Sequence, residues 1–75
     1  MSTIEELKIW LDLERVNTKL CANDPLLLEI ATAELAELRS GLINSEEHRA
    51  EYTDMYKTLT DLLYLRVDKF ARGMV

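Results

Sequence analysis

The first third of the chain alternates hydrophobic and polar residues with the period of an α-helix. Two apolar stripes flank its polar side, and they consist of Ile4, Leu7, Trp10 and Leu11, and of Ile9, Leu13, Val16 and Leu20. Because Glu14 and Asn17 interrupt the first stripe, we expect the second stripe to face the core. Ser2 and Thr3 each precede a Glu by three residues, the capping-box pattern that starts a helix. The pattern predicts a helix over residues 3–22.

The clearest boundary in the pattern is Asp24-Pro25. Pro25 lacks an amide hydrogen, so it ends a preceding helix but suits the first position of a new one, with Asp24 as N-cap. We predict a helix over residues 25–40 that ends at Gly41 in the left-handed conformation. Its apolar side consists of Leu27, Leu28, Ala31, Leu35, Leu38 and Leu42.

A third, longer helix is predicted over residues 45–72, with Asn44 as N-cap and no Gly or Pro before Gly73. Its apolar residues recur at steps of three and four, and they are Tyr52, Tyr56, Leu59, Leu63, Val67, Phe70 and Met74. At 1.5 Å per residue this helix is about 42 Å long, against about 30 Å and about 24 Å for the first two.

The length of the third helix leaves its C-terminal turns without enough apolar surface in the same chain to cover them. We therefore expect an all-α fold in which two shorter helices and one long C-terminal helix form an antiparallel hairpin-type bundle, completed by dimerisation. The expected oligomer or partner interface is Leu62, Leu63, Tyr64, Leu65, Val67, Phe70 and Met74, together with Trp10 on the first helix.

The length of 75 residues limits the chain to a single helical domain, 1–75, that buries only about 60% of its unfolded surface as a monomer. One Cys and one His provide neither an internal disulfide nor a zinc set, which again favours oligomerisation.

The longest apolar run, residues 62–65, is far short of the roughly 20 residues that span a bilayer. Acidic residues near the start replace the positive charge of a signal peptide, so we expect a cytoplasmic protein that does not enter a membrane.

The net charge of −5 is unevenly distributed. Residues 1–44 hold 8 acidic and 4 basic residues, whereas residues 45–75 hold 6 acidic and 5 basic ones. Arg66, Lys69 and Arg72 form a possible basic patch at the end of the third helix. General nucleic-acid binding is disfavoured by the acidic balance, but this patch leaves open a nucleic-acid-binding dimer. The acidic helices leave open an inhibitor that mimics nucleic acid.

No residue pattern indicates an enzyme, a metal site or a cofactor. His48 lies among acidic residues, but Ser45 occupies the position where a helical carboxylate metal site would carry Glu. Cys21 follows an apolar residue and has no His near it in sequence, so we expect a covered, unreactive thiol. The leading interpretation is therefore a small, acidic, non-enzymatic accessory or regulatory protein of bacterial or phage type, which binds another protein as a helical homodimer.

Overall fold

The computed structural model describes residues 2–41 and 46–74, and these residues form three packed α-helices. They are α1 (Thr3–Val16), α2 (Pro25–Ser40) and α3 (Glu46–Ala71), of which α3 is the longest. The all-α prediction of two shorter helices and one long C-terminal helix is confirmed. The predicted roles of Leu42, Asn44 and Ser45 lie outside the described residues.

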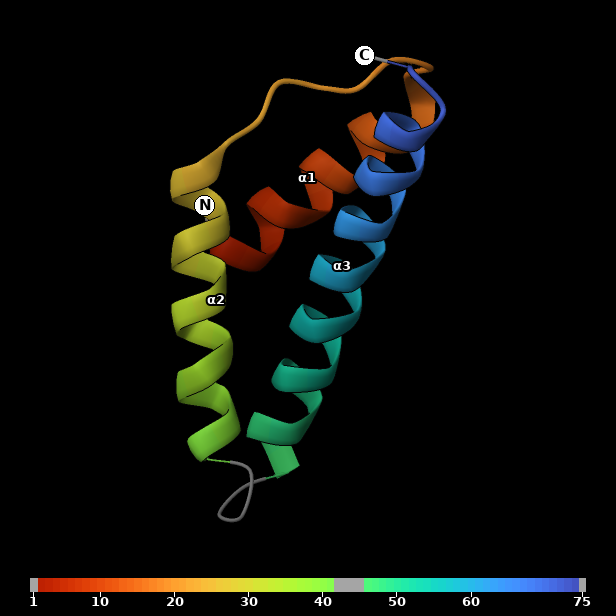
Figure 1. Cartoon of the computed structure of the whole chain (residues 1–75). Coiled ribbons are helices and arrows are strands. Elements are labelled where there is room, and N and C mark those ends of the chain that lie inside the picture. The colour runs from red at the N-terminus through yellow and green to blue at the C-terminus, as the bar shows by residue number, and fades with distance from the viewer. Residues whose placement is uncertain (1, 42–45, 75) are drawn as a thin grey trace.

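The helices α2 and α3 lie side by side and antiparallel, while α1 crosses obliquely between them (Figure 1). Thr3 Oγ1 donates to Glu34 Oε1 at 2.7 Å, so α1 starts beside the middle of α2. Lys8 contacts Asp54 early in α3, and Glu14 contacts Lys69 near its end. The prediction of two antiparallel neighbours for α3 is therefore wrong for α1, which runs in the same direction as α3.

The two stripes of α1 exchange the roles expected from the sequence. Residues of the first stripe join the buried core, which consists of Leu7, Trp10, Leu11, Leu27, Ala31, Met55, Leu59 and Leu62. Ile9, Leu13 and Val16 of the second stripe remain 44%, 49% and 77% exposed. The prediction failed because Glu14, which interrupts the first stripe in sequence, is itself fully buried against two cations.

The first helix ends at Val16 instead of continuing to residue 22. Asn17 adopts an extended conformation, and both its amide and its side chain donate to the carbonyl of Leu13. The segment of residues 17–24 then passes over the end of the bundle beside the C-terminus, where the Leu20 amide donates to Met74 O at 2.7 Å (Figure 1).

The second helix begins and ends at the predicted residues, with the Leu27 amide donating to Asp24 Oδ1 at 3.1 Å. Gly41 is not left-handed, since its φ is −91°. A Cβ at this position would approach His48 Cδ2 to 3.0 Å, so Gly41 provides space for the imidazole of α3. The left-handed glycine is Gly73, with φ +73°, which follows the end of α3.

Candidate functional site

The residues predicted as an interface divide into buried and exposed groups. Leu62 and Trp10 belong to the core of the chain itself. Leu65 is partly buried against that core, and Met74 is also partly covered. The residues that remain exposed are Leu63, Tyr64, Val67 and Phe70.

Four exposed apolar side chains line one side of α3, and we call this surface the α3 stripe: Tyr56, Leu63, Val67 and Phe70. At 100° per residue these positions fall within one narrow sector of the helix, whereas Tyr64 lies well outside it. Val67 and Phe70 are 66% and 72% exposed. Tyr52 extends the stripe toward the start of α3 by stacking on Tyr56, with ring centroids 5.8 Å apart. Thr60 lies in the same sector of the helix, between Tyr56 and Leu63, and is polar but uncharged.

The predicted basic patch does not form an exposed surface. Lys69 is 5% exposed, and Arg66 is partly buried against Glu14. Arg72 is exposed but pairs with Asp68 at 3.2 Å, one turn earlier on α3. Arg66 and Lys69 thus act inside the molecule, and the three residues do not offer a continuous set of free positive charges.

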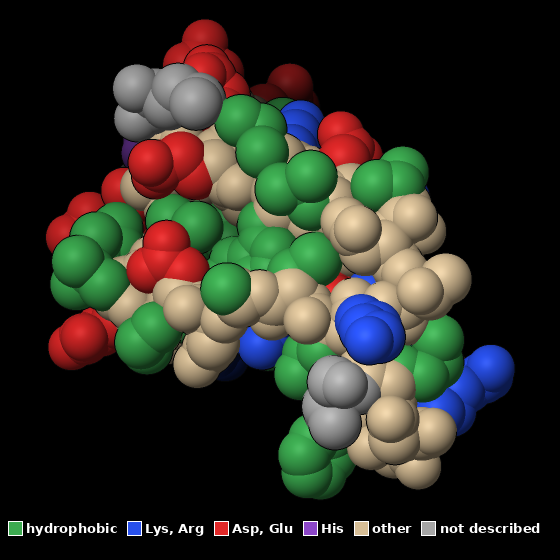
Figure 2. All heavy atoms as spheres, turned by 90° about the horizontal axis from the view of Figure 1, so that it is seen from above, with side chains coloured by type: hydrophobic (Ala, Val, Ile, Leu, Met, Phe, Trp, Pro, Cys, Tyr) green, Lys and Arg blue, Asp and Glu red, His purple; other side chains and the backbone are tan. Residues whose placement is uncertain are grey.

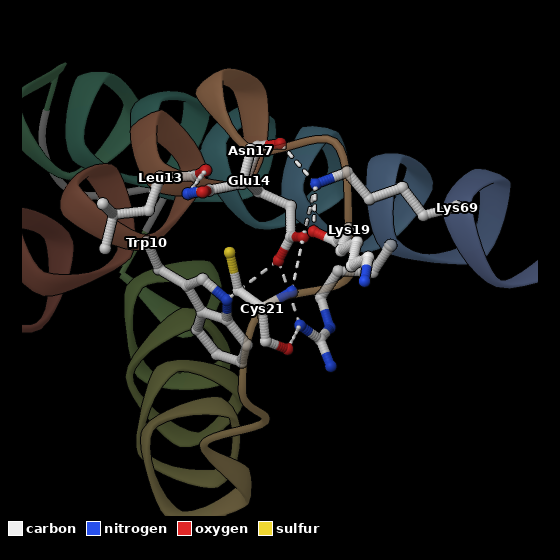
Figure 3. Close-up of polar contacts among 8 residues, drawn as sticks. Trp10, Leu13, Glu14, Asn17, Lys19, Cys21 and Lys69 are labelled. Atoms are coloured by element: carbon white, nitrogen blue, oxygen red, sulfur yellow. Dashed lines mark hydrogen bonds and ion pairs between the residues drawn. The ribbon is translucent and has the colours of Figure 1, made fainter. Parts of the chain in front are cut away.

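A buried ionic cluster joins the ends of α1 and α3, and Glu14 is at its centre (Figure 3). Its Oε1 accepts from Lys69 Nζ at 2.7 Å and from the Cys21 amide at 3.0 Å. Its Oε2 accepts from Arg66 Nη1 at 3.0 Å and from Trp10 Nε1 at 3.1 Å. These four hydrogen bonds use the full accepting capacity of a carboxylate.

Both cations of the cluster also donate to backbone carbonyls. Lys69 Nζ donates to the carbonyls of Glu14 and Lys19 as well as to the Glu14 carboxylate, which uses all three ammonium hydrogens. Arg66 donates to the Cys21 carbonyl at 2.9 Å, and its guanidinium lies 4.9 Å from the ring centre of Trp10. The cluster therefore fixes both the end of α1 and the path of residues 17–24.

The electrostatics of Glu14 follow from these contacts. Burial alone would raise its pKa, but the hydrogen bonds from Lys69, the Cys21 amide and Arg66 outweigh burial and lower the pKa to about 2. Glu14 is thus a buried carboxylate that stays ionised at neutral pH. Partners on α1, on α3 and in the segment of residues 17–24 stabilise this charge.

Sequence reasoning missed this cluster, although a signal was present. Glu14 lies on the apolar stripe that proved to be the core stripe, and Arg66 and Lys69 lie on the side of α3 that carries Leu62. Opposite charges on the inward sides of two helices indicate a buried pair. The sequence did not reveal this pair, because the second stripe of α1 was expected to face the core, and Glu14 does not lie on that stripe.

Two hollows border α1, one beside its first residues and the other beside its middle. The larger, of about 720 Å³, has an acidic lining that includes Glu34, Glu37, Glu51 and Asp54, with His48 beside them.

Within residues 2–41 and 46–74, no group of three or more His, Cys, Asp or Glu side chains is arranged to hold a metal ion. In the same residues no helix is both long enough and apolar enough to cross a membrane.

The smaller hollow, of about 450 Å³, lies between α1, residues 17–24 and the start of α2. We call it the N-terminal groove, and it is lined by Glu6, Ile9, Trp10, Leu13, Cys21, Ala22, Asn23, Asp24 and Leu27. In the view from above, hydrophobic side chains gather in the middle of the face, with acidic groups mainly on one side and basic groups mainly on the other (Figure 2).

Cys21 lines the N-terminal groove. Burial and the neighbouring Glu14 carboxylate both raise the pKa of its thiol, which favours the less nucleophilic protonated form. His48 lies beside Gly41 and lines the other hollow, so the fold does not bring it to Cys21.

No family model, curated protein or solved structure matches this chain.

Proposed function

We propose that this chain is a small non-enzymatic interaction protein that works as a homodimer, and that the α3 stripe is the dimer interface. The observation that carries the proposal is the exposure of Tyr56, Leu63, Val67 and Phe70 along one uncharged side of α3. The stripe covers about 21 Å of helix at 1.5 Å per residue. A second copy offers the same uncharged surface, so two stripes pair without burying an unpaired charge.

The expected strength of this dimer follows from the size of the stripe. Burial of apolar surface contributes roughly 25 cal/mol per Å², and exposed apolar patches larger than a few hundred Å² are rare on monomers. A standard stable interface buries about 800 Å² per partner, which is more than one helix face supplies. We therefore expect a concentration-dependent dimer in the micromolar range.

The test measures molar mass by light scattering coupled to gel filtration, over micromolar to submillimolar loading concentrations. We expect the wild-type mass to approach twice 8.7 kDa. Val67→Lys and Phe70→Lys place a charge in the stripe and should give monomers. Tyr64→Lys is the matched control, because Tyr64 is equally exposed but lies outside the stripe.

A wild-type chain that stays monomeric at the highest concentration would overturn the proposal. Equal effects of Val67→Lys and Tyr64→Lys would also overturn it, since the stripe would then have no special role. Circular dichroism on each variant shows whether the helices are retained.

A further inference from the structure

We propose that the N-terminal groove docks a short basic amphipathic helix from a partner protein. The inference rests on the proposed function in treating the chain as an interaction protein, but it concerns a different face from the α3 stripe. It names the chemistry of the partner: apolar side chains spaced at helical intervals, with Lys or Arg beside them.

The walls of the groove carry apolar side chains that the fold leaves uncovered. Ile9 and Leu13 project from α1 one turn apart, and they are nearly half exposed. Leu27 lines the opposite side, and Trp10 and Cys21 lie deeper because both are buried or partly buried. A volume of about 450 Å³ is within the range of roughly 300–1,000 Å³ typical of pockets that enclose ligand groups.

The apolar surface continues beyond the groove along both helices. Val16 follows Leu13 on α1 and is 77% exposed. On α2, Ile30 lies one turn before Glu34, the residue that accepts the Thr3 hydroxyl of α1, so Ile30 is on the side of α2 that faces α1. An elongated apolar surface between two diverging helices fits an amphipathic helix, which binds through anchors spaced three and four residues apart.

The charge of the residues that line the N-terminal groove indicates which kind of partner helix would bind there. Glu6 and Asp24 lie at the groove, and no Lys or Arg is among the described residues that line it. Opposite charge at the rim of an interface steers association and disfavours wrong partners, so Lys or Arg flanking the apolar anchors is the complementary arrangement.

A second copy of the chain matches this groove less well. The α3 stripe of a second copy is uncharged and leaves Glu6 and Asp24 without cationic partners, and the groove face of a second copy carries the same two acidic residues. Contact between the stripe of one copy and the groove of another would also be heterologous, and repeated contacts of this kind build rings or open chains of molecules.

The experiment uses Trp10 as the reporter, because it is the only Trp in the chain and it lines the groove. The probe is a model helical peptide of about 15 residues without aromatic residues, with Leu on one face and Lys on the other. A second peptide carries Glu in place of each Lys. We expect the Lys peptide to change Trp10 emission saturably and to bind at least about tenfold more tightly than the Glu peptide, with affinity falling as salt rises.

Two pairs of variants locate the binding site. Glu6→Lys should weaken binding of the Lys peptide about tenfold, whereas Glu5→Lys makes the same charge change on the neighbouring residue, which does not line the groove. Leu13→Ala should weaken binding, whereas Leu26→Ala removes an exposed Leu that does not line the groove. Because all four residues are exposed, we expect the fold to be retained.

Equal binding of the Lys and Glu peptides, or equal effects of Glu5→Lys and Glu6→Lys, would overturn the proposal. A change of oligomeric state in Glu6→Lys without loss of peptide binding would instead assign the groove to a second copy. The same titration on Phe70→Lys separates the two proposals. Peptide binding that survives in this variant supports the groove whether or not the stripe forms a dimer, and loss of binding there would place the peptide on the stripe.

Discussion

The C-terminal half of α3 has two sides that reverse the usual distribution of residues. Its inward side carries Arg66 and Lys69, which are buried against Glu14 of α1. Its outward side carries Leu63, Val67 and Phe70, which are exposed. Charges are tolerated inside because every hydrogen-bonding group of Glu14 and Lys69 is matched, whereas the apolar side chains outside remain between 41% and 72% exposed. The comparison teaches that one side of this helix completes the fold, and that the other stays exposed in the single chain, where the proposed dimer would bury it.

The largest expected effect comes from breaking the inward side. Glu14→Gln removes the only carboxylate of the cluster and leaves Arg66 and Lys69 as uncompensated cations. We expect a loss of about 3–5 kcal/mol in the free energy of unfolding, measured with urea. Glu29→Gln on the exposed side of α2 is the control and should change stability by less than about 0.5 kcal/mol. An equally small effect of Glu14→Gln would show that the cluster does not hold α1 to α3.

A double variant sharpens the same prediction. Glu14→Leu with Lys69→Met replaces the closest ion pair by apolar groups of similar volume. This replacement removes the desolvation of two charges together but leaves the partly buried Arg66 guanidinium without its carboxylate, so it should recover only part of the stability that Glu14→Gln loses. A double variant as unstable as Glu14→Gln would show that an unpaired Lys69 is not the main source of the loss.

Acid should produce the next largest effect. The pKa of Glu14 falls from an ordinary value of 4.5 to about 2, so the folded state holds the ionised form more strongly than the unfolded state does. A lowered folded pKa contributes stability that is complete above about pH 4.5 and is lost as the pH falls toward 2. The contribution is about 3 kcal/mol, since each pKa unit corresponds to about 1.4 kcal/mol.

This pH dependence is measured by urea unfolding at intervals from pH 6 to pH 2, in the wild type and in Glu14→Gln. The other carboxylates titrate in both chains, so the difference between the two curves isolates Glu14. We expect that difference to shrink as the pH falls through this range. A constant difference would contradict the assignment of the lowered pKa to Glu14.

The smallest effect on monomer stability is expected on the outward side. Val67→Ser alters an exposed residue, so the unfolding free energy of the monomer should change by less than about 0.5 kcal/mol. Its effect should appear in association: the thermal midpoint of the wild type should rise with protein concentration, and that of Val67→Ser should not. A midpoint that depends equally on concentration in both chains would remove the contrast between the two sides.

Local signals in the sequence accounted for α2 and for the start of α1. Pro25 with Asp24 determines the start of α2 through missing hydrogen bonds and side-chain capping, which are interactions within one turn. Ser2 likewise caps α1 by accepting from the Glu5 amide. The length of α3 was also readable, because no Gly or Pro interrupts it and its apolar residues keep a helical period.

The end of α1 and its inward side were not readable in the same way. No helix breaker stands between Val16 and Pro25, yet the helix ends at Val16 where Asn17 caps the carbonyl of Leu13 and Lys69 binds the carbonyls of Glu14 and Lys19. Lys69 is 55 residues away from Glu14. The same contact makes an acidic residue part of the core stripe, which reversed the choice between the two stripes.

The sequence by itself determined that this protein is helical, that it has three helices, and that the third carries more apolar surface than a small chain readily covers. These features depend on capping, helix breakers and periodicity, all of which act between neighbouring residues. Only the tertiary structure decided which stripe of α1 is buried, where α1 ends, and that Arg66 and Lys69 face inward. Those outcomes depend on the pairing of charges between α1 and α3, and the free energy of a buried charge is set by partners that sequence spacing does not reveal.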